Sequence, residues 1–445
     1  MTIAAIATPN MTGGIGIIRI SGEKAIEIAS GLFYGKDVKT MESHKMHLGK
    51  IKVNNETVDS ALVCVFKAPN SYTGEDVVEF HCHGGIAVCK TVLDAVYKNG
   101  AVPAGPGEFT KRAFLNGKMD LSQAEAVADL INAQTEKQVT VAASQLDKAL
   151  SGEISTLRQK LIDATAHVMA TMDYSEEGVE PMEYDELTDI LKHCLNETEK
   201  LIRTSDNGRI ISDGVNVAIV GSPNAGKSSL LNAILGEDRA IVTNIEGTTR
   251  DVLETAVNIR GLKLILFDTA GIRESDDTIE QIGIKRSKET LEKADIVFFV
   301  VDGNKGMTAE ETEIANMVDK KKTLLVINKS DLAQQKIDSH GYLGCVVVSA
   351  KNAEGFDGLY DLIYEKYGQI DIKEKAVVTN PRHKESLIRA NSLIGEALND
   401  IGAFAPFDIV LSSVELSISA LGEIGGETVS EEIIDNIFSK FCVGK

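Results

Sequence analysis

The sequence predicts a multidomain protein of mixed α+β and α/β class. We expect an N-terminal mixed-sheet domain, a discontinuous α-helical domain, and an α/β domain with a mostly parallel sheet inserted into the helical one. Three observations predict this: a chain of 445 residues exceeds what one hydrophobic core normally organises, short β-branched runs dominate its beginning, and apolar strands alternate with helical segments further on.

The residue pattern of the chain changes at Met119. Residues 1–118 hold β-branched runs separated by glycine and proline, which is typical of a mixed sheet with a few helices. From Met119 to about Arg209 the apolar residues have helical spacing and proline is rare, with an interruption near 178–181. We therefore expect an N-terminal domain over 1–118 and the first part of a helical domain over 119–213.

Four continuous apolar runs follow, each separated from the next by a helical segment. Strands that are apolar on both faces predict a parallel sheet covered by helices on both sides. Helical spacing returns after about residue 371, so we expect an inserted domain over 214–370 and the second helical part over 371–445. The predicted strands cover residues 217–220, 264–267, 296–300 and 324–327.

Charge and cysteine content restrict the function. The net charge of −20 and the isoelectric point near 4.9 argue against a protein that coats nucleic acid, so any RNA contact must be a local patch or be shared with a partner. The six cysteines lack paired spacing, which favours reduced thiols. Neither a long apolar run nor a signal core is present, so we expect a cytoplasmic protein without membrane contact.

The strongest motif is a phosphate-binding loop. Residues 221–228 fit the pattern G-x-x-x-x-G-K-[ST] between a strand and a helix. The glycines let backbone N–H groups surround the phosphates, Lys227 supplies a positive charge to the β- and γ-phosphates, and the Ser228 hydroxyl can bind Mg²⁺.

Three further motifs follow in the order found in Ras-like P-loop GTPases. Residues 268–271 (D-T-A-G) end an apolar strand, and residues 328–331 (N-K-S-D) match N-K-x-D, in which Asp331 can accept the N1–H and N2 hydrogens of guanine. Residues 349–351 (S-A-K) fit the loop that supports guanine O6. Taken singly, Asp268 fits a helix cap and residues 328–331 an exposed turn equally well. Their joint order predicts GTP rather than ATP.

These motifs occur together with a wider resemblance, to the MnmE (TrmE) family of tRNA-modifying GTPases, and the resemblance runs from end to end. Its G domain carries the stretches seen here at 247–251 and 268–274, followed by Glu280. The implied GTP contacts are Asn224, Ala225, Gly226, Lys227, Ser228, Ser229, Thr243, Asn244, Ile245, Glu246, Gly247, Thr248, Thr249, Asp268, Thr269, Ala270, Gly271, Asn328, Lys329, Asp331, Ser349, Ala350 and Lys351.

The resemblance also implies a hydrolytic mechanism. In Ras-like proteins a glutamine after the D-x-x-G motif orients water, whereas this chain has Ile272 there. Arg250 and Arg273 fit an internal arginine finger, although ordinary surface ion pairs fit them better. In the family two G domains pair, and a potassium ion supplies the positive charge, while Glu280 fixes the catalytic water. The implied metal ligands are Asn224, Thr243, Ile245 and Thr248 for K⁺, and Ser228 and Thr249 for Mg²⁺.

Residues 1–118 resemble the folate-binding domain of the same family. The match rests on 7–9, 14–22, 71–76, 81–85 and 106–118. It implies that Arg19, Glu79 and Lys118 contact 5-formyl- or 5,10-methylene-tetrahydrofolate, although surface ion pairs explain Arg19 and Lys118 equally well. His81 and His83 should share one strand face with Cys82 on the other, which does not favour a zinc site.

The C-terminus, Phe441-Cys442-Val443-Gly444-Lys445, matches the F-C-[IV]-G-K end of the family. The match implies that Cys442 takes part in chemistry and that Lys445 contacts folate, with a plain buried thiol as the alternative for Cys442. A cysteine fourth from the end also fits prenylation, but Gly444 and Lys445 suit that signal poorly.

The family works as a homodimer and with the flavoprotein MnmG (GidA), in a heterotetramer that acts on tRNA. Together they add an aminomethyl or carboxymethylaminomethyl group to C5 of the wobble uridine, using a folate-borne carbon, flavin and NADH. Two alternatives stay open: a ribosome-assembly GTPase of the Era or Der type, and a folate-binding regulator without enzymatic activity. Folate binding by 1–118 separates the family from the first, and GTP hydrolysis separates it from the second.

Overall fold

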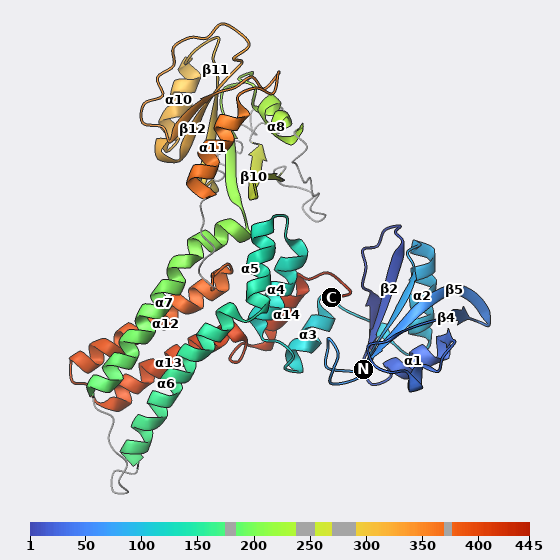
Figure 1. Ribbon diagram of the computed structural model, residues 1–445. Coiled ribbons are helices and arrows are strands. Elements are labelled where there is room, and N and C mark those ends of the chain that lie inside the picture. Colours follow the sequence, from blue (N-terminus) through green and yellow to red (C-terminus); the bar gives the residue numbers. More distant parts are fainter. Residues whose placement is uncertain (174–183, 237–253, 269–290, 369–375) are drawn as a thin grey trace, which may run out of the picture. The chain divides into compact units, whose positions relative to one another are not determined.

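A computed structural model describes residues 1–173, 184–236, 254–268, 291–368 and 376–445 (Figure 1). The chain forms two compact units, each with its own sheet. Unit 1 comprises Met1–Ala128, Gln145–Thr198 and Ser386–Lys445, and unit 2 comprises Asp129–Ser144 and Glu199–Glu385. The predicted helix interruption near 178–181 lies outside the described residues.

The sheet of unit 1 has seven strands in the order β3-β4-β5-β6-β2-β1-β7. Neighbouring strands are antiparallel except β1 and β7, which run parallel. The predicted mixed sheet is therefore confirmed. The strands are β1 (Ile3–Ile6), β2 (Ile15–Ser21), β3 (Phe33–Tyr34), β4 (Met46–Val53), β5 (Glu56–Phe66), β6 (Val77–His83) and β7 (Val102–Pro103).

The core of this sheet lies on the face that helices α1 (Ala25–Leu32) and α2 (Ile86–Lys98) cover. Successive side chains of a strand point to opposite faces. Ile18 and Phe80 are therefore fully buried in the core, whereas their neighbours Arg19 and Glu79 project from the other face. The alternation gives the sheet one face that α1 and α2 cover and a second face that carries Arg19 and Glu79.

The helical elements occur before and after the second sheet in sequence. In unit 1, α6 packs along α13: Arg158 of α6 donates to the Ile418 carbonyl (3.3 Å) and pairs with Glu427 (2.5 Å). The helices are α3 (Glu108–Leu115), α4 (Leu121–Asn132), α5 (Glu136–Leu146), α6 (Ala149–Asp173), α7 (Tyr184–Ser212), α12 (Pro381–Gly402), α13 (Phe407–Gly425) and α14 (Glu431–Ser439).

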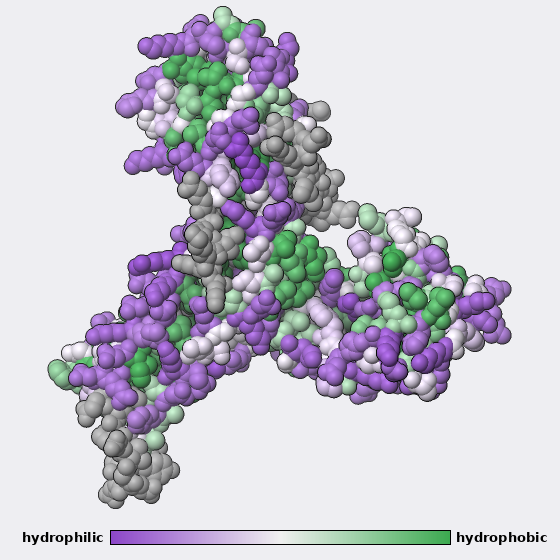
Figure 2. Space-filling view, viewed as in Figure 1, coloured by the Kyte–Doolittle hydropathy of each residue, from purple (hydrophilic) through white to green (hydrophobic). Residues whose placement is uncertain are grey.

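Side chains on the visible face of α6 and α7 are mostly hydrophilic (Figure 2), as amphipathic helices with a single buried stripe require. No helix among the described residues has both the length and the apolar character needed to traverse a lipid bilayer.

The sheet of unit 2 has six strands in the order β13-β12-β11-β8-β10-β9. All neighbouring pairs are parallel except β9 and β10. The mostly parallel inserted sheet is confirmed, and each of the four predicted strands lies within an observed one. The strands are β8 (Val215–Val220), β9 (Glu254–Ile259), β10 (Leu262–Asp268), β11 (Ile296–Asp302), β12 (Thr323–Asn328) and β13 (Gly344–Val347).

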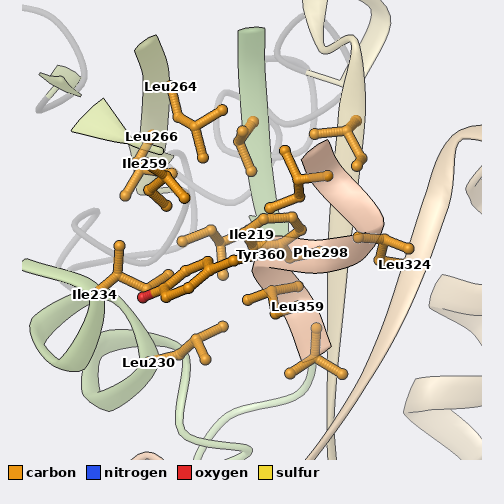
Figure 3. Close-up of a cluster of buried hydrophobic side chains, with 14 of the residues drawn as sticks. Ile219, Leu230, Ile234, Ile259, Leu264, Leu266, Phe298, Leu324, Leu359 and Tyr360 are labelled. Carbon is orange, nitrogen blue, oxygen red and sulfur yellow. The ribbon is translucent and has the colours of Figure 1, made fainter. Parts of the chain in front are cut away.

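Both faces of this sheet are buried, which explains its continuous apolar strands. On one face, Ile219, Phe298 and Leu324 pack with Leu230 of α8 (Lys227–Gly236) and residues of α11 (Phe356–Tyr367) (Figure 3). The other face has its own core, which includes Val297, Phe299 and Leu325 from the central strands and Ala315 of α10 (Ala309–Met317). The two cores fix the carboxyl ends of β8, β11 and β12 at one edge, where ligands bind in open α/β sheets.

Candidate functional site

The loop between β8 and α8 is held against the ends of two neighbouring strands. Gly221 has a φ of +155° and Gly226 a φ of +100°. A Cβ at Gly221 would lie 2.2 Å from the Val300 carbonyl oxygen, and one at Gly226 would lie 2.1 Å from Asn328 Nδ2. Only glycine fits at either position, so the loop backbone can approach β11 and β12 closely.

Lys227 is already folded over this loop. Its Nζ donates to the carbonyl oxygens of Gly221 (2.8 Å) and Ser222 (2.9 Å). Ser228 and Ser229 are exposed in the first turn of α8, whose N–H groups and dipole favour an anion. Asn224 is exposed as well, and adopts a φ of +63°. The predicted phosphate-binding groups therefore gather at one helix N-terminus.

The guanine motif is tied to this loop through Asn328. Its Nδ2 donates to the Ala225 carbonyl (3.0 Å), and its Oδ1 accepts from the N–H groups of Lys329 (2.8 Å) and Ala350 (3.0 Å). Because Asn328 is only 2% exposed, these bonds are shielded from water. One buried side chain thus joins three of the predicted motifs.

Asp331 is oriented by the third motif. Ser349 is fully buried and its Oγ donates to Asp331 Oδ1 (2.7 Å), while the Asp331 side chain stays exposed. Lys351 lies exposed two residues after Ser349. The carboxylate is therefore held in position before guanine arrives, which lowers the ordering cost of binding.

Lys329 has a partner that the sequence analysis missed. Its Nζ pairs with Asp302 at the end of β11 (2.6 Å). Burial acts to raise the pKa of Asp302, but the hydrogen bonds from Lys329 and from the Asn304 N–H, together with the charge of Lys329, lower that pKa below its ordinary value. The only sequence signal for this pairing is an acidic residue at the end of an apolar strand.

The remaining predicted GTP and metal contacts lie mainly outside the described residues. Asp268 ends β10, where its backbone is in register with Ile219, so the D-x-x-G motif starts beside the phosphate-binding loop. The predicted contacts without a structural description are Thr243, Asn244, Ile245, Glu246, Gly247, Thr248, Thr249, Thr269, Ala270, Gly271 and Glu280.

A second polar site lies on the outer face of the sheet in unit 1. Arg19 of β2 and Glu79 of β6 are opposite each other in register, with Arg19 Nε 2.8 Å from Glu79 Oε1. The guanidinium also lies 5.6 Å from the ring centres of both Tyr72 and Phe109. Glu79 Oε2 lies 3.2 Å from His81 Nε2. The predicted folate residues Arg19 and Glu79 are thus brought together.

The C-terminal tail closes on the same site. The Gly107 N–H donates to the Cys442 carbonyl (3.3 Å), and the Phe109 N–H donates to the Lys445 carbonyl (3.1 Å). Arg19 Nη1 reaches the Gly444 carbonyl at 3.4 Å. The tail therefore lies beside Arg19, although the sequence separates them by 425 residues.

The other candidates in unit 1 differ in their surroundings. Lys118 Nζ donates to the Pro69 carbonyl at 3.0 Å. Cys442 is exposed, whereas burial raises the pKa of the Cys82 thiol to about 12. His81 and His83 face away from the core that contains Cys82, as the strand alternation predicts. Tyr72 and Phe109 were missed, since a single aromatic residue in a polar segment carries no signal of its own for a binding site.

The comparisons with known proteins agree along the whole chain. A family model described as the MnmE helical domain matches residues 121–442, and one described as the GTP-binding protein TrmE N-terminus matches 2–118. A tRNA modification GTPase MnmE from Alkaliphilus oremlandii is 44% identical over 459 aligned residues, covering 100% of this chain and 99% of the relative. One from Acetivibrio thermocellus is 43% identical over 458 residues, with the same two shares.

Identity of this degree over the full length, together with a family model covering more than half of the chain, settles the classification. The chain belongs to the MnmE family of tRNA modification GTPases and is a GTP hydrolase of that family.

Proposed function

We propose that this protein hydrolyses GTP by potassium-dependent pairing of two G domains and, with the flavoprotein MnmG, modifies C5 of the wobble uridine in tRNA. The added group is aminomethyl or carboxymethylaminomethyl, and its carbon comes from a tetrahydrofolate. The observation that carries the proposal is the full-length match to MnmE relatives combined with a guanine site whose three motifs are joined by Asn328.

We propose that four segments of the chain form three domains. Residues 1–118 bind tetrahydrofolate and dimerise, 119–213 and 371–445 form the helical domain, and 214–370 form the G domain. The match of separate family models to 2–118 and 121–442 supports the first boundary.

The chemistry of the loop at the start of α8 fits a nucleotide with Mg²⁺. Ser228 offers an exposed hydroxyl at a helix N-terminus, and we propose that it holds Mg²⁺ together with Thr249. The bound metal neutralises phosphate charge. The chain's own Lys227, already directed across the loop, binds the β- and γ-phosphates, and Asp331 selects guanine.

For hydrolysis we propose that Glu280 orients the attacking water and that Asn224, Thr243, Ile245 and Thr248 hold K⁺. The exposed Asn224 in its left-handed conformation supports this, since its amide oxygen suits a monovalent cation. Glu280→Ala should keep GTP affinity and lose turnover by roughly 10²-fold or more. Unchanged turnover would remove that role, and equal rates in KCl and NaCl would remove the potassium site.

For the one-carbon step we propose that Arg19, Glu79, Lys118 and Lys445 bind 5-formyl- or 5,10-methylene-tetrahydrofolate. The Arg19 guanidinium suits the glutamate tail of folate and a carboxylate such as Glu79 suits pterin N–H donors. The half-buried Tyr72 ring beside Arg19 adds a surface for a planar ring. Exposed Cys442, on the same tail as Lys445, is the proposed chemical participant.

The proposed assembly is a homodimer that joins MnmG in a heterotetramer on tRNA in the cytoplasm. The net charge of −20 supports the need for a partner, because this chain alone offers little electrostatic attraction for RNA. The names of the matched relatives, which refer to tRNA modification, favour this over an Era- or Der-type function.

The direct test is mass spectrometry of tRNA from cells that lack the gene. Loss of the C5 group from wobble uridine, restored by the wild-type gene but not by Lys227→Ala, is the expected result. Normal wobble uridine in the deletion strain, together with unaltered ribosome profiles, would leave both the tRNA proposal and the Era-type alternative without support.

A further inference from the structure

A buried carboxylate outside the nucleotide motifs contacts the phosphate-binding loop. Glu311 of α10 is 1% exposed, and its Oε1 accepts a hydrogen bond from Ser222 Oγ (2.8 Å). Its Oε2 accepts from the N–H (2.8 Å) and the Oγ1 (2.9 Å) of Thr308, the N-cap of the helix. Three hydrogen-bond donors thus satisfy the buried Glu311 carboxylate and hold it in one position.

Ser222 continues this contact to the phosphate-binding lysine. Ser222 is 9% exposed, and its carbonyl oxygen accepts the hydrogen bond from Lys227 Nζ (2.9 Å). The side chain of Ser222 is therefore fixed by Glu311 while its backbone fixes Lys227. Ser222 thus links the Glu311 carboxylate directly to the carbonyl oxygen that accepts from Lys227 Nζ.

We infer that Glu311 is a positioning residue for GTP binding: acting through Ser222, it sets the loop backbone that holds Lys227 toward the phosphates. This inference rests on the family's GTP hydrolysis and on neither the folate nor the tRNA steps. Glu311 has a separate structural task as the partner of Thr308 in a capping box. The two carboxylate oxygens divide these tasks, so they can be tested separately.

A polar cavity adjoins the contact between Glu311 and Ser222. Ser222, Thr308 and Glu311 line a cavity of about 300 Å³ together with polar groups such as Asp302 and Lys305. Water can enter there and hydrogen-bond the groups that a shorter side chain leaves behind. Glu311→Ala removes both the contact with Ser222 and the capping box, so its effect on stability is compared with that of Thr308→Ala, which removes only the cap hydroxyl.

The experiment compares five variants of the full chain: Ser222→Ala, Glu311→Ala, the double variant of these two, Thr308→Ala and, as a control, Glu313→Ala. Glu313 is an exposed carboxylate on the same helix. GTP and GDP affinities come from titration with fluorescent nucleotides, turnover from phosphate release, and stability from thermal unfolding followed by circular dichroism.

Ser222→Ala and Glu311→Ala should each weaken GTP binding about tenfold, as loss of one charge-assisted bond predicts. The double variant should be no worse than either single one, because both remove the same contact. Thr308→Ala should lower the unfolding temperature because it removes the cap hydroxyl. It should leave GTP affinity within about twofold, since Glu311 Oε2 keeps the Thr308 N–H and Oε1 keeps Ser222. Turnover at saturating GTP should change far less than affinity in Ser222→Ala and Glu311→Ala, and Glu313→Ala should match the wild type in every measurement.

Three outcomes overturn the inference. The first is unchanged GTP affinity in Ser222→Ala. The second is a loss of affinity in Thr308→Ala that equals the loss in Glu311→Ala, which would assign the effect to the helix cap. The third is full additivity in the double variant.

Discussion

The two polar sites of this molecule are assembled in opposite ways. In unit 2, the nucleotide site takes its residues from loops that each follow a strand of one parallel sheet, and Asn328 alone joins three of them. In unit 1, the Arg19 site lies across two antiparallel strands and is closed by the C-terminal tail, 425 residues away. The first is specified by short motifs, whereas the second depends on a long-range contact.

The two sites also differ in the contacts that stabilise them. The Asn328 contacts are buried and made largely to backbone, so most substitutions elsewhere in the loop leave them in place. Arg19 and Glu79 retain 17% and 12% side-chain exposure, and the Gly444 contact is long at 3.4 Å. We therefore expect the nucleotide site to be preformed and the Arg19 site to depend on the tail.

The largest expected effect concerns base selection at the preformed site. Asp331→Asn should weaken GTP binding on the order of 10⁴-fold, because the amide presents N–H groups to the N–H edge of guanine. It should improve binding of xanthosine triphosphate, whose C2 carbonyl can accept from that amide. Competition titrations measure the affinities for both nucleotides. The control is Asp338→Asn, which changes an exposed aspartate of the same segment. Equal loss for both nucleotides would contradict a guanine contact by Asp331.

The second prediction tests the tail. Gly444 has a φ of +97°, and a Cβ there would lie 2.3 Å from the Ile6 carbonyl oxygen, so Gly444→Ala should displace the tail. We expect folate affinity to fall about 10- to 30-fold and a carboxypeptidase to remove Lys445 faster, with GTP turnover unchanged.

Gly395→Ala is the matched control, because nothing lies within 4 Å of a Cβ at that helical position. Faster proteolysis with unchanged folate affinity would show that the tail docks there without contributing to folate binding. Unchanged proteolysis would contradict the docking itself.

The third prediction concerns the ion pair of the same site. Arg19→Met removes the partner of the mostly buried Glu79 and should lower the free energy of unfolding by about 1–3 kcal/mol. Arg19→Met combined with Glu79→Gln should recover part of that loss, since no charge is left unpaired. Urea unfolding of Arg19→Met, Glu79→Gln and the double variant measures these effects. A double variant at least as destabilised as the sum of the two single effects would contradict the pairing.

The smallest effect is a dependence on pH at the nucleotide site. Because the folded pKa of Asp302 lies below its ordinary value of 3.8, the Lys329 pair stabilises the protein above that pH. The contribution is lost as the pH falls through the folded pKa. Asp302→Asn should therefore flatten the acid side of the stability curve below about pH 4. Asp338→Asn is the control. If Asp302→Asn loses stability at acid pH as the wild type does, the result would contradict the pairing.

Glu311 belongs to neither kind of site. It lies outside every nucleotide motif, yet its contact with Ser222 places α10 against the phosphate-binding loop. Its sequence signal is the capping box T-x-x-E, which predicts the start of a helix and gives no indication of the contact with Ser222.

The sequence by itself determined the fold class, the four central strands of unit 2, and the guanine and phosphate motifs. Apolar runs and turn glycines are local properties, and the carboxyl ends of parallel strands meet at one edge without further information. Tertiary structure alone decided that Asp302 pairs with Lys329, that Tyr72 and Phe109 flank Arg19, and that the tail closes that site. These contacts join distant segments, and their side-chain types fit an ordinary core or surface equally well until packing brings them together.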